Sequence, residues 1–401
     1  MIFFCIRKYP DIDNFSPIID SFKKTKIKIT ILNLNIKKNY IKDYRVNFLL
    51  KSNKNLNYVN LIELFNFSNF QKKFYQIVFE KDNKFIFRLI RFVINKFFKN
   101  YLVKLIFNKD KIKIKQKKID VLVIDHLLPS KLFFFNLFFH YLKKNNVKII
   151  SLPAGLPLYK KHPKAWNKAK NEIRQITKLV DKIVLQHKFW DKEIFKSESY
   201  SHKRVILGSP RYLNTWRKKL FKIIPNTPNL NNTKKLKVVY MDSNNPTHID
   251  FQEKKQKLLS ELSRIDNAVI KFKPHPRSEK IYINLPTNIE ICKKIESINL
   301  IKWADVVMSD ISAIAIEVLL QNKRFINLKL LRKKENKMIY DDFKISENLL
   351  TINDLHKVLF RKKEQIDSFY LKKDLKKFLD LVVYYPDKDL LKRYQNIILN
   401  S

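Results

Sequence analysis

The chain has 401 residues, a formal net charge of +45 from 82 Lys and Arg against 37 Asp and Glu, and 45% hydrophobic residues. It is long and apolar enough for two or three domains with buried cores, which excludes a disordered tail. Its two glycines, where average usage gives about 28, exclude the GxGxxG dinucleotide fingerprint and the Walker A loop.

Short apolar runs alternate with helical patterns along most of the chain, which predicts the α/β class with parallel sheets and helical crossovers. The expected strands are Ile2–Ile6, Val121–Ile124, Val147–Leu152, Lys182–Leu185, Val205–Leu207, Leu236–Met241, Ala268–Phe272, Asp305–Met308 and Arg324–Leu328. The expected helices between them are Pro129–Lys144, Lys164–Leu179, Phe251–Arg264, Glu296–Ala304 and Ser312–Gln321. A further helix is expected at Asp387–Leu399.

The alternation breaks at residues 223–235, where Pro225, Pro228 and several asparagines predict a linker. The linker divides the chain into an N-terminal domain at residues 1–222 and a C-terminal domain at residues 236–350, followed by helices at residues 351–401.

Phe85–Phe107 has the pattern of a basic amphipathic helix, because its polar residues recur every three to four positions and form one stripe. Such a helix either packs against the first sheet with its cations outward or lies in a membrane interface. No run of about 18 uncharged apolar residues occurs, so no spanning helix is predicted.

The lysine excess is spread over the whole chain, whereas nucleic-acid-binding proteins usually gather basic residues on one face or arm. The charge therefore indicates a surface attracted to anionic membranes and phosphate groups rather than a specific nucleic-acid partner. Cys5 and Cys292 lack the spacing of a disulfide framework or a zinc site. We expect a cytoplasmic protein without a bound metal, able to lie on the inner face of the cell membrane.

A first candidate site is the segment AVIKFKPHPR at Ala268–Arg277. Lys271, Lys273, His275 and Arg277 recur at period two, so a mostly extended backbone would aim them in one direction. Cations at the carboxyl end of a parallel strand form an anion site, where ligands of open α/β sheets bind. The alternative is a solvated basic strand end. Two prolines frame His275 and favour the binding site, because a rigid loop loses little entropy on binding.

A second candidate is ADVVMSDISAIAIEVLL at Ala304–Leu320, which reads as strand, turn and helix. Ser309, Asp310 and Ser312 would lie where the helix begins, with backbone N–H groups and hydroxyls suited to a phosphate. Helix capping by Ser or Asp is the alternative for these residues. Glu317 on the helix either accepts hydrogen bonds from ribose hydroxyls or is an exposed carboxylate.

These two segments resemble the C-terminal half of GT-B transferases that build bacterial surface polymers. The resemblance is to the CDP-glycerol glycerophosphotransferase and surface-carbohydrate (capsule) biosynthesis group. It is carried by KPHPR and by the run from Asp305 to Ser312, and VILGSPRY resembles the GxPR turn that ends the family's first domain. Gly208 lies in that turn, and Gly155 follows Ala154, where relatives carry a His-Gly pair. Ala313 also departs from the family, since a second serine is common there.

The resemblance implies two Rossmann-like domains facing across a cleft. The C-terminal domain would bind a CDP-, CMP- or UDP-linked donor, and no other cofactor is implied. Lys273, His275 and Arg277 would neutralise the leaving phosphate together with the helix start at Ser309–Ser312, so the reaction would need no metal. The acceptor would be a hydroxyl of a surface polysaccharide or a lipid-linked precursor.

The acceptor hydroxyl needs a base from the N-terminal domain. Asp13 is our first candidate, although it could also cap a helix. Asp11, Asp125 and His126 also follow first-domain strands and remain open as alternatives.

Three other hypotheses compete with a GT-B transferase: another glycosyltransferase fold and two other functions. Asp11–Asp13 and Asp387–Asp389 match the DxD metal clip of the other large glycosyltransferase fold, but matches of three residues are common by chance. Sugar-nucleotide 2-epimerases share the GT-B architecture. A basic nucleic-acid-binding protein is supported by charge alone.

Overall fold

The computed structural model describes residues 1–35, 38–64, 68–69, 119–126, 128–129, 132–153, 155, 158–161, 163–195, 200–225, 230, 233–243, 251–275, 284–333, 336–383 and 389–400. Its contacts divide the chain into two compact units. The first unit comprises Met1–Gly155, Lys168–Ile224 and Val383–Ser401, and the second comprises Leu156–Asn167 and Pro225–Val382. The predicted helix at residues 85–107 lies outside the described residues.

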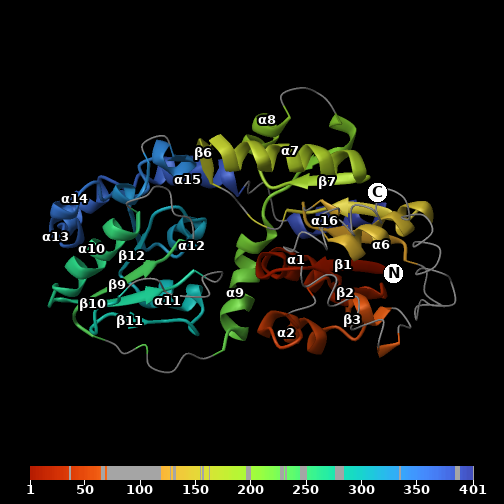
Figure 1. Ribbon diagram of the computed structural model, residues 1–401, viewed down its shortest axis with the longest axis horizontal. Helices are drawn as coiled ribbons and strands as arrows, with labels where there is room; N and C mark the ends of the chain where they lie inside the picture. The colour runs from red at the N-terminus through yellow and green to blue at the C-terminus, as the bar shows by residue number, and fades with distance from the viewer. Residues whose placement is uncertain are drawn as a thin grey trace. The chain divides into compact units, whose positions relative to one another are not determined.

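The described part of the first unit contains a seven-stranded sheet in the order β3-β2-β1-β4-β5-β7-β8, with parallel pairing throughout (Figure 1). Its strands are β1 Ile2–Ile6, β2 Ile29–Asn33, β3 Leu56–Asn60, β4 Val121–Ile124, β5 Lys148–Ser151, β7 Lys182–Leu185 and β8 Arg204–Ile206. Its helices are α1 Tyr9–Ser21, α2 Tyr44–Ser52, α6 Phe133–Lys144, α8 Lys188–Ile194, α9 Asn214–Ile223 and α16 Leu390–Asn400, together with most of α7 Pro163–Leu179. Short 3-10 turns are η1 Phe22–Lys24, η2 Leu61–Leu64, η5 Ser201–Lys203 and η6 Pro210–Tyr212.

The core of the first unit joins its sheet to α1 and α16. Every residue of β1 and β2 is buried, as expected for parallel strands covered on both faces. Phe4 and Phe15 pack within this core with ring centroids 6.0 Å apart. Leu390, Tyr394 and Ile398 bury one face of α16 in the same core, and Tyr394 Oη donates to Gly208 O at 2.9 Å. The last helix of the chain therefore belongs to the first unit rather than to a separate C-terminal group.

The described part of the second unit contains a six-stranded parallel sheet in the order β11-β10-β9-β12-β13-β15 (Figure 1). The strands are β9 Leu236–Met241, β10 Ala268–Lys273, β11 Glu290–Ile291, β12 Val306–Ser309, β13 Arg324–Asn327 and β15 Glu347–Asn348. The helices are α10 Phe251–Ser263, α11 Ser297–Trp303, α12 Ile314–Leu320, α13 Leu355–Leu359, α14 Lys363–Asp367 and α15 Lys372–Val382. The smaller elements are the antiparallel pair β6 Tyr159–Lys161 and β14 Lys337–Met338, and the turns η7 Lys329–Leu331, η8 Ile339–Asp342 and η9 Ile352–Asp354.

In both units the first strand lies inside the sheet, with the second and third on one side and the fourth and fifth on the other. This is the Rossmann-like strand order, so the predicted α/β class with two Rossmann-like domains is confirmed. The order reverses between β1 and β4 in the first sheet and between β9 and β12 in the second. Open α/β sheets bind ligands outside the carboxyl ends of the strands at such a reversal. None of the described helices is long and apolar enough to span a lipid bilayer.

Candidate active site

The carboxyl edge of the second sheet brings together most of the predicted donor-binding residues. His275 follows β10, Ser309 ends β12, and Asp310 and Ser312 lie between β12 and α12. β9 lies between β10 and β12 in the sheet, so these residues flank the reversal of strand order. Arg277 and Pro276 lie outside the described residues.

The lysines of β10 are bound by groups of the second unit itself. Lys271 is 3% exposed, forms an ion pair with Glu290, and places Nζ 5.0 Å from the centroid of the Trp303 ring. Lys273 Nζ donates to Lys293 O at 2.8 Å and to Ile295 O at 2.6 Å, and burial lowers its pKa. The period-two pattern therefore does not gather these two ammonium groups into one open anion site. An ammonium has three donors, and the two carbonyls account for two of those on Lys273.

Ser309 and Asp310 are fully buried and join β12 to the end of β9. Ser309 Oγ donates to Met241 O at 3.0 Å, and Ser243 Oγ donates to Asp310 Oδ2 at 2.7 Å. Burial raises the pKa of Asp310. In this structure the two buried side chains connect the carboxyl ends of β9 and β12, so neither is exposed at the edge of the sheet.

Ser312 and Glu317 differ from each other in exposure. Ser312 is partly exposed, and its Oγ accepts, at 3.1 Å, the N–H of Ile314, one of the N–H groups in the first turn of α12 that have no partner within the helix. Glu317 is only 5% exposed and accepts a hydrogen bond from Gln321 Nε2 at 3.0 Å. The structure thus gives Ser312 a capping contact and places Glu317 in the interior rather than on an exposed helical face.

Three residues of this edge were not singled out from the sequence. Asp242 and Ser243 follow β9, and the buried Lys255 of α10 forms an ion pair with Asp242. Their only signal in the sequence is the position of Asp242 directly after an apolar strand.

In the first unit, Asp13 lies in α1 and is held by two guanidinium groups. Arg45 of α2 binds Oδ1, and Arg211 Nη1 lies 3.1 Å from Oδ2. Arg211 belongs to the GSPR segment that resembles the family's GxPR turn. The two arginines connect α1 to α2 and to η6, so Asp13 occupies a defined position with 20% of its side chain exposed.

The alternative base candidates form one cluster at the carboxyl ends of β1, β4 and β5. Asp125 forms ion pairs with Arg7 at 2.8 Å and Lys8 at 3.4 Å. His126 Nδ1 lies 2.7 Å from Ser151 Oγ, and burial lowers the pKa of His126 to about 4. The imidazole is therefore neutral at pH 7.

Asp11 is the most buried member of this cluster. Its Oδ2 accepts the backbone N–H groups of Arg7 at 2.8 Å and Lys8 at 3.0 Å, which caps α1. Burial, reinforced by the Asp125 carboxylate, raises the pKa of Asp11 to about 8.

Replacing Asp11 by asparagine should flatten the dependence of stability on pH. The folded chain keeps the Asp11 proton up to about pH 8, whereas the unfolded chain loses it near pH 4, so ionisation favours unfolding between those values. The free energy of unfolding of the wild type, relative to that of Asp11→Asn, should fall from pH 5 to pH 8 with a slope approaching about 1.4 kcal/mol per pH unit. Urea unfolding at several pH values measures it. The exposed Asp266→Asn is the control, and a slope no larger than the control's would contradict the expectation.

The two predicted turn glycines do not depend on left-handed backbone. Neither described glycine has a positive φ. A Cβ built on Gly155 meets no atom within 4 Å, so a side chain would fit there. Gly208 contributes its carbonyl to the Tyr394 hydrogen bond.

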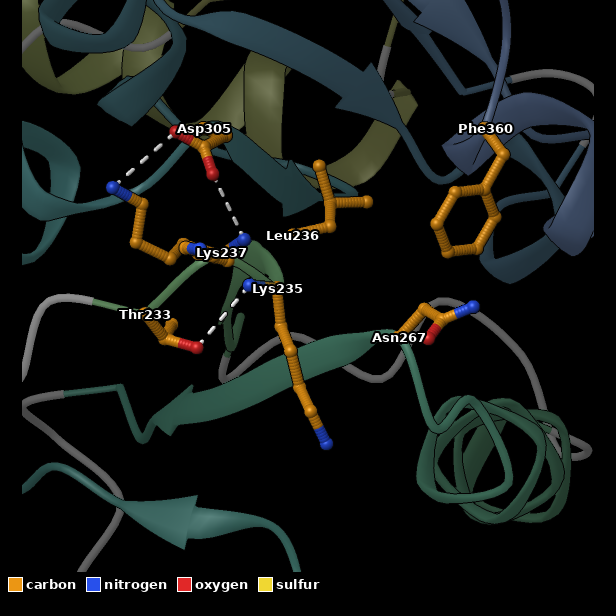
Figure 2. A pocket seen from close by; sticks show the side chains of 8 residues that line it. Thr233, Lys235, Leu236, Lys237, Asn267, Asp305 and Phe360 are labelled. Carbon is orange, nitrogen blue, oxygen red and sulfur yellow. Dashed lines mark hydrogen bonds and ion pairs between the residues drawn. The ribbon is translucent and has the colours of Figure 1, made fainter.

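A pocket of about 690 Å³ lies at the opposite, amino edge of the second sheet (Figure 2). Its lining includes Thr233, Lys235, Lys237, Asp305 and Phe360. Asp305 Oδ2 accepts the Lys237 N–H at 2.9 Å, and Oδ1 lies 3.6 Å from Lys237 Nζ. This pair joins the amino ends of β9 and β12, far along the strands from His275, so the pocket is separate from the predicted donor site.

No protein-family model and no curated protein matches the sequence. Solved structures do match its fold. The Methanocaldococcus jannaschii UDP-GlcNAc 2-epimerase in complex with UDP-GlcNAc and UDP has a TM-score of 0.58 at 11% identity, covering 100% of this chain and 99% of that chain. The S. aureus MnaA-UDP structure has a TM-score of 0.56 at 12% identity, covering 99% and 95%.

A variant of the wall teichoic acid polymerase TagF is also similar, with a TM-score of 0.54 at 12% identity, covering 100% of this chain and 88% of that chain. These matches span both units of the chain. Together with the two Rossmann-like sheets, they show that the chain has a GT-B-like two-domain fold.

Proposed function

We propose that this protein transfers a glycosyl or polyol-phosphate group from a nucleotide-activated donor to a hydroxyl of a cell-surface polysaccharide or lipid-linked acceptor. The observation that carries the proposal is the placement of His275 and the β12–α12 turn at one carboxyl edge, on either side of β9. Ligands of this fold class bind at that place. The likeness to enzymes solved with UDP supports a nucleotide-linked donor, and the carrier would be CDP, CMP or UDP.

In the proposed reaction the acceptor oxygen attacks the transferred group, its proton passes to a base, and the nucleotide leaves with its bonding electron pair. The negative charge that develops on the leaving phosphate requires hydrogen-bond donors and cations. His275 and Arg277 would supply these, with Lys273 adding positive charge beside them, and the reaction would proceed without a metal. Ser312 and the backbone beside it would contact the phosphate, while the buried Ser309 and Asp310 keep the turn in place.

The first unit would supply the base. Asp13 has the most exposed side chain of the three candidate carboxylates, at 20% against 11% for Asp125, and Asp11 is fully buried. A base must reach the acceptor proton, so accessibility favours Asp13. Its two arginine partners would then orient the carboxylate.

A sugar-nucleotide 2-epimerase is the second candidate, because the UDP-GlcNAc 2-epimerases match nearly the full length of this chain. Transfer and epimerisation differ in the molecule to which the sugar or polyol phosphate is attached after the reaction. A transferase attaches it to the acceptor and releases the nucleotide, whereas an epimerase leaves an altered sugar on the nucleotide.

Incubation with donors labelled in the transferred group tests the two functions. We expect label in a product that elutes with the acceptor, nucleotide released in equal amount, and the same yield in EDTA. A changed sugar still attached to its nucleotide would assign the epimerase function. Loss of turnover in EDTA, restored by a divalent cation, would contradict the metal-independent mechanism.

A further inference from the structure

A buried ion pair lies directly beneath the loop that carries His275. Lys255 of α10 donates to Asp242 Oδ1, and the two side chains are 4% and 7% exposed. The Lys255 ammonium also lies 5.7 Å from the ring centroids of Phe251 and Phe272. Burying a charged pair costs free energy unless further hydrogen bonds satisfy it, so the other partners of Asp242 are informative.

Two of those partners, Lys273 and His275, lie at the end of β10 and just after it, and the third is the neighbouring Ser243. The Asp242 N–H donates to Lys273 O at 2.9 Å, and the Asp242 carboxylate accepts the backbone N–H groups of His275 and Ser243. One residue therefore binds the chain on both sides of Pro274. Burial raises the pKa of Asp242, and Lys255 acts against this rise.

The same short segment is tied to the turn before α12. Ser243 Oγ donates to the buried Asp310 at 2.7 Å, and Met241 O accepts from Ser309 Oγ at 3.0 Å. Residues 241–243 thus bind the loop after β10 on one side and the turn after β12 on the other. Buried hydrogen bonds are electrostatically stronger than exposed ones, so these contacts favour a fixed position of both segments relative to residues 241–243.

We propose that Asp242, held by Lys255, is a positioning residue that sets the place of His275 relative to the turn at Asp310–Ser312. This inference rests on the proposed function, because it assigns Asp242 to the donor-phosphate site. Asp242 acts through the backbone of His275 and does not itself contact the donor. Misplacing a binding group by about 1 Å can reduce rate about a hundredfold, so the effect of losing this residue is large for a group that touches no substrate.

The sheet offers a matched control. Asp305 also contacts a backbone N–H and an ammonium, both of Lys237, between β9 and β12, but at the amino edge and with 43% of its side chain exposed. Asp242→Ala should lower kcat/KM tenfold to a hundredfold, Asp242→Asn less because it keeps one acceptor oxygen, and Asp305→Ala less than twofold. Equal losses in Asp242→Ala and Asp305→Ala would contradict the proposal.

A mutant cycle on UDP affinity separates positioning from general destabilisation. We expect Asp242→Asn to weaken UDP binding about fivefold in the wild type and less than twofold in His275→Ala, since the effect passes through His275. Additive losses would overturn the proposal. If the full chain binds neither UDP nor CMP at millimolar concentration, the proposed function itself is wrong.

Amide exchange of the unliganded full chain tests the contact without a nucleotide. In Asp242→Ala the His275 amide should exchange at least tenfold faster than in the wild type and in Asp305→Ala, and in Asp242→Asn it should exchange faster by a smaller factor. Unchanged protection would show that Asp242 does not hold this loop, whatever the donor. This measurement also decides the question if Asp242→Ala fails to fold.

Discussion

Replacing His275 by alanine should lower kcat about 100-fold to 1000-fold, the range for removing one donor from a transition-state oxyanion site. The imidazole would be lost at the carboxyl end of β10, where the proposed leaving phosphate lies. Folding should be unchanged, because the His275 group that Asp242 binds is the backbone N–H, which alanine retains. Turnover of labelled donor and thermal unfolding measure the two effects.

Two variants make this result specific. His356→Ala removes an exposed imidazole that packs on Phe360 in the same unit, and it should leave kcat within twofold of the wild type. His275→Gln keeps a hydrogen-bond donor and should retain more activity than His275→Ala. Wild-type kcat in His275→Ala would remove His275 from the mechanism.

The strands that the sequence predicted well are those buried as continuous apolar runs. β1, β4, β7 and β9 begin and end at the predicted residues. The sequence does not predict β2 although all five of its residues are buried, because Thr30 and Asn33 leave no continuous apolar run longer than two residues. β3 was missed because two asparagines break up LNYVN. Continuous apolar runs in the sequence therefore predict the central strands of a sheet better than the strands near its edge.

Tertiary contacts made the last helix harder to assign. The spacing of Leu390, Tyr394 and Ile398 is readable as one apolar face, and the helix itself was predicted. Which core receives that face depends on contacts with residues far away in the sequence, and local sequence carries no such information. The hydrogen bond from Tyr394 to Gly208 joins residues 186 positions apart.

The same limit applies to the candidate site. The rule that parallel strands present their carboxyl ends at one edge was enough to place His275 and Ser312 together. It could not reveal that Ser309 and Asp310 form buried hydrogen bonds with Met241 and Ser243, because those partners lie 67 or 68 positions away in the sequence. Buried ion pairs such as Asp242 with Lys255 cannot be predicted from the sequence either. A lysine-rich sequence does not indicate which of its ammonium groups is buried.

Glu347→Ala should destabilise the second unit by about 3–5 kcal/mol, the usual cost of removing one partner from a buried ion pair. The Glu347 side chain in β15 is fully buried between two guanidinium groups. Arg324 donates Nε to Oε1 at 2.9 Å and Nη2 to Oε2 at 3.0 Å, and Arg361 Nη1 donates to Oε2 at 3.0 Å.

The loss of stability in Glu347→Ala should be large because Glu347 also holds Arg324 in place. Arg324 donates to Leu359 O at 3.0 Å and Val358 O at 2.9 Å and so connects β13 to the end of α13. Without Glu347, two largely buried cations face each other with no carboxylate between them. Urea unfolding gives the free energy, and amide exchange in β13 and β15 locates the loss in the second unit. The exposed Glu364→Ala in α14 should change the free energy of unfolding by less than about 0.5 kcal/mol. Equal unfolding midpoints for Glu347→Ala and Glu364→Ala would mean that the Arg324–Glu347–Arg361 cluster does not stabilise the edge of this sheet.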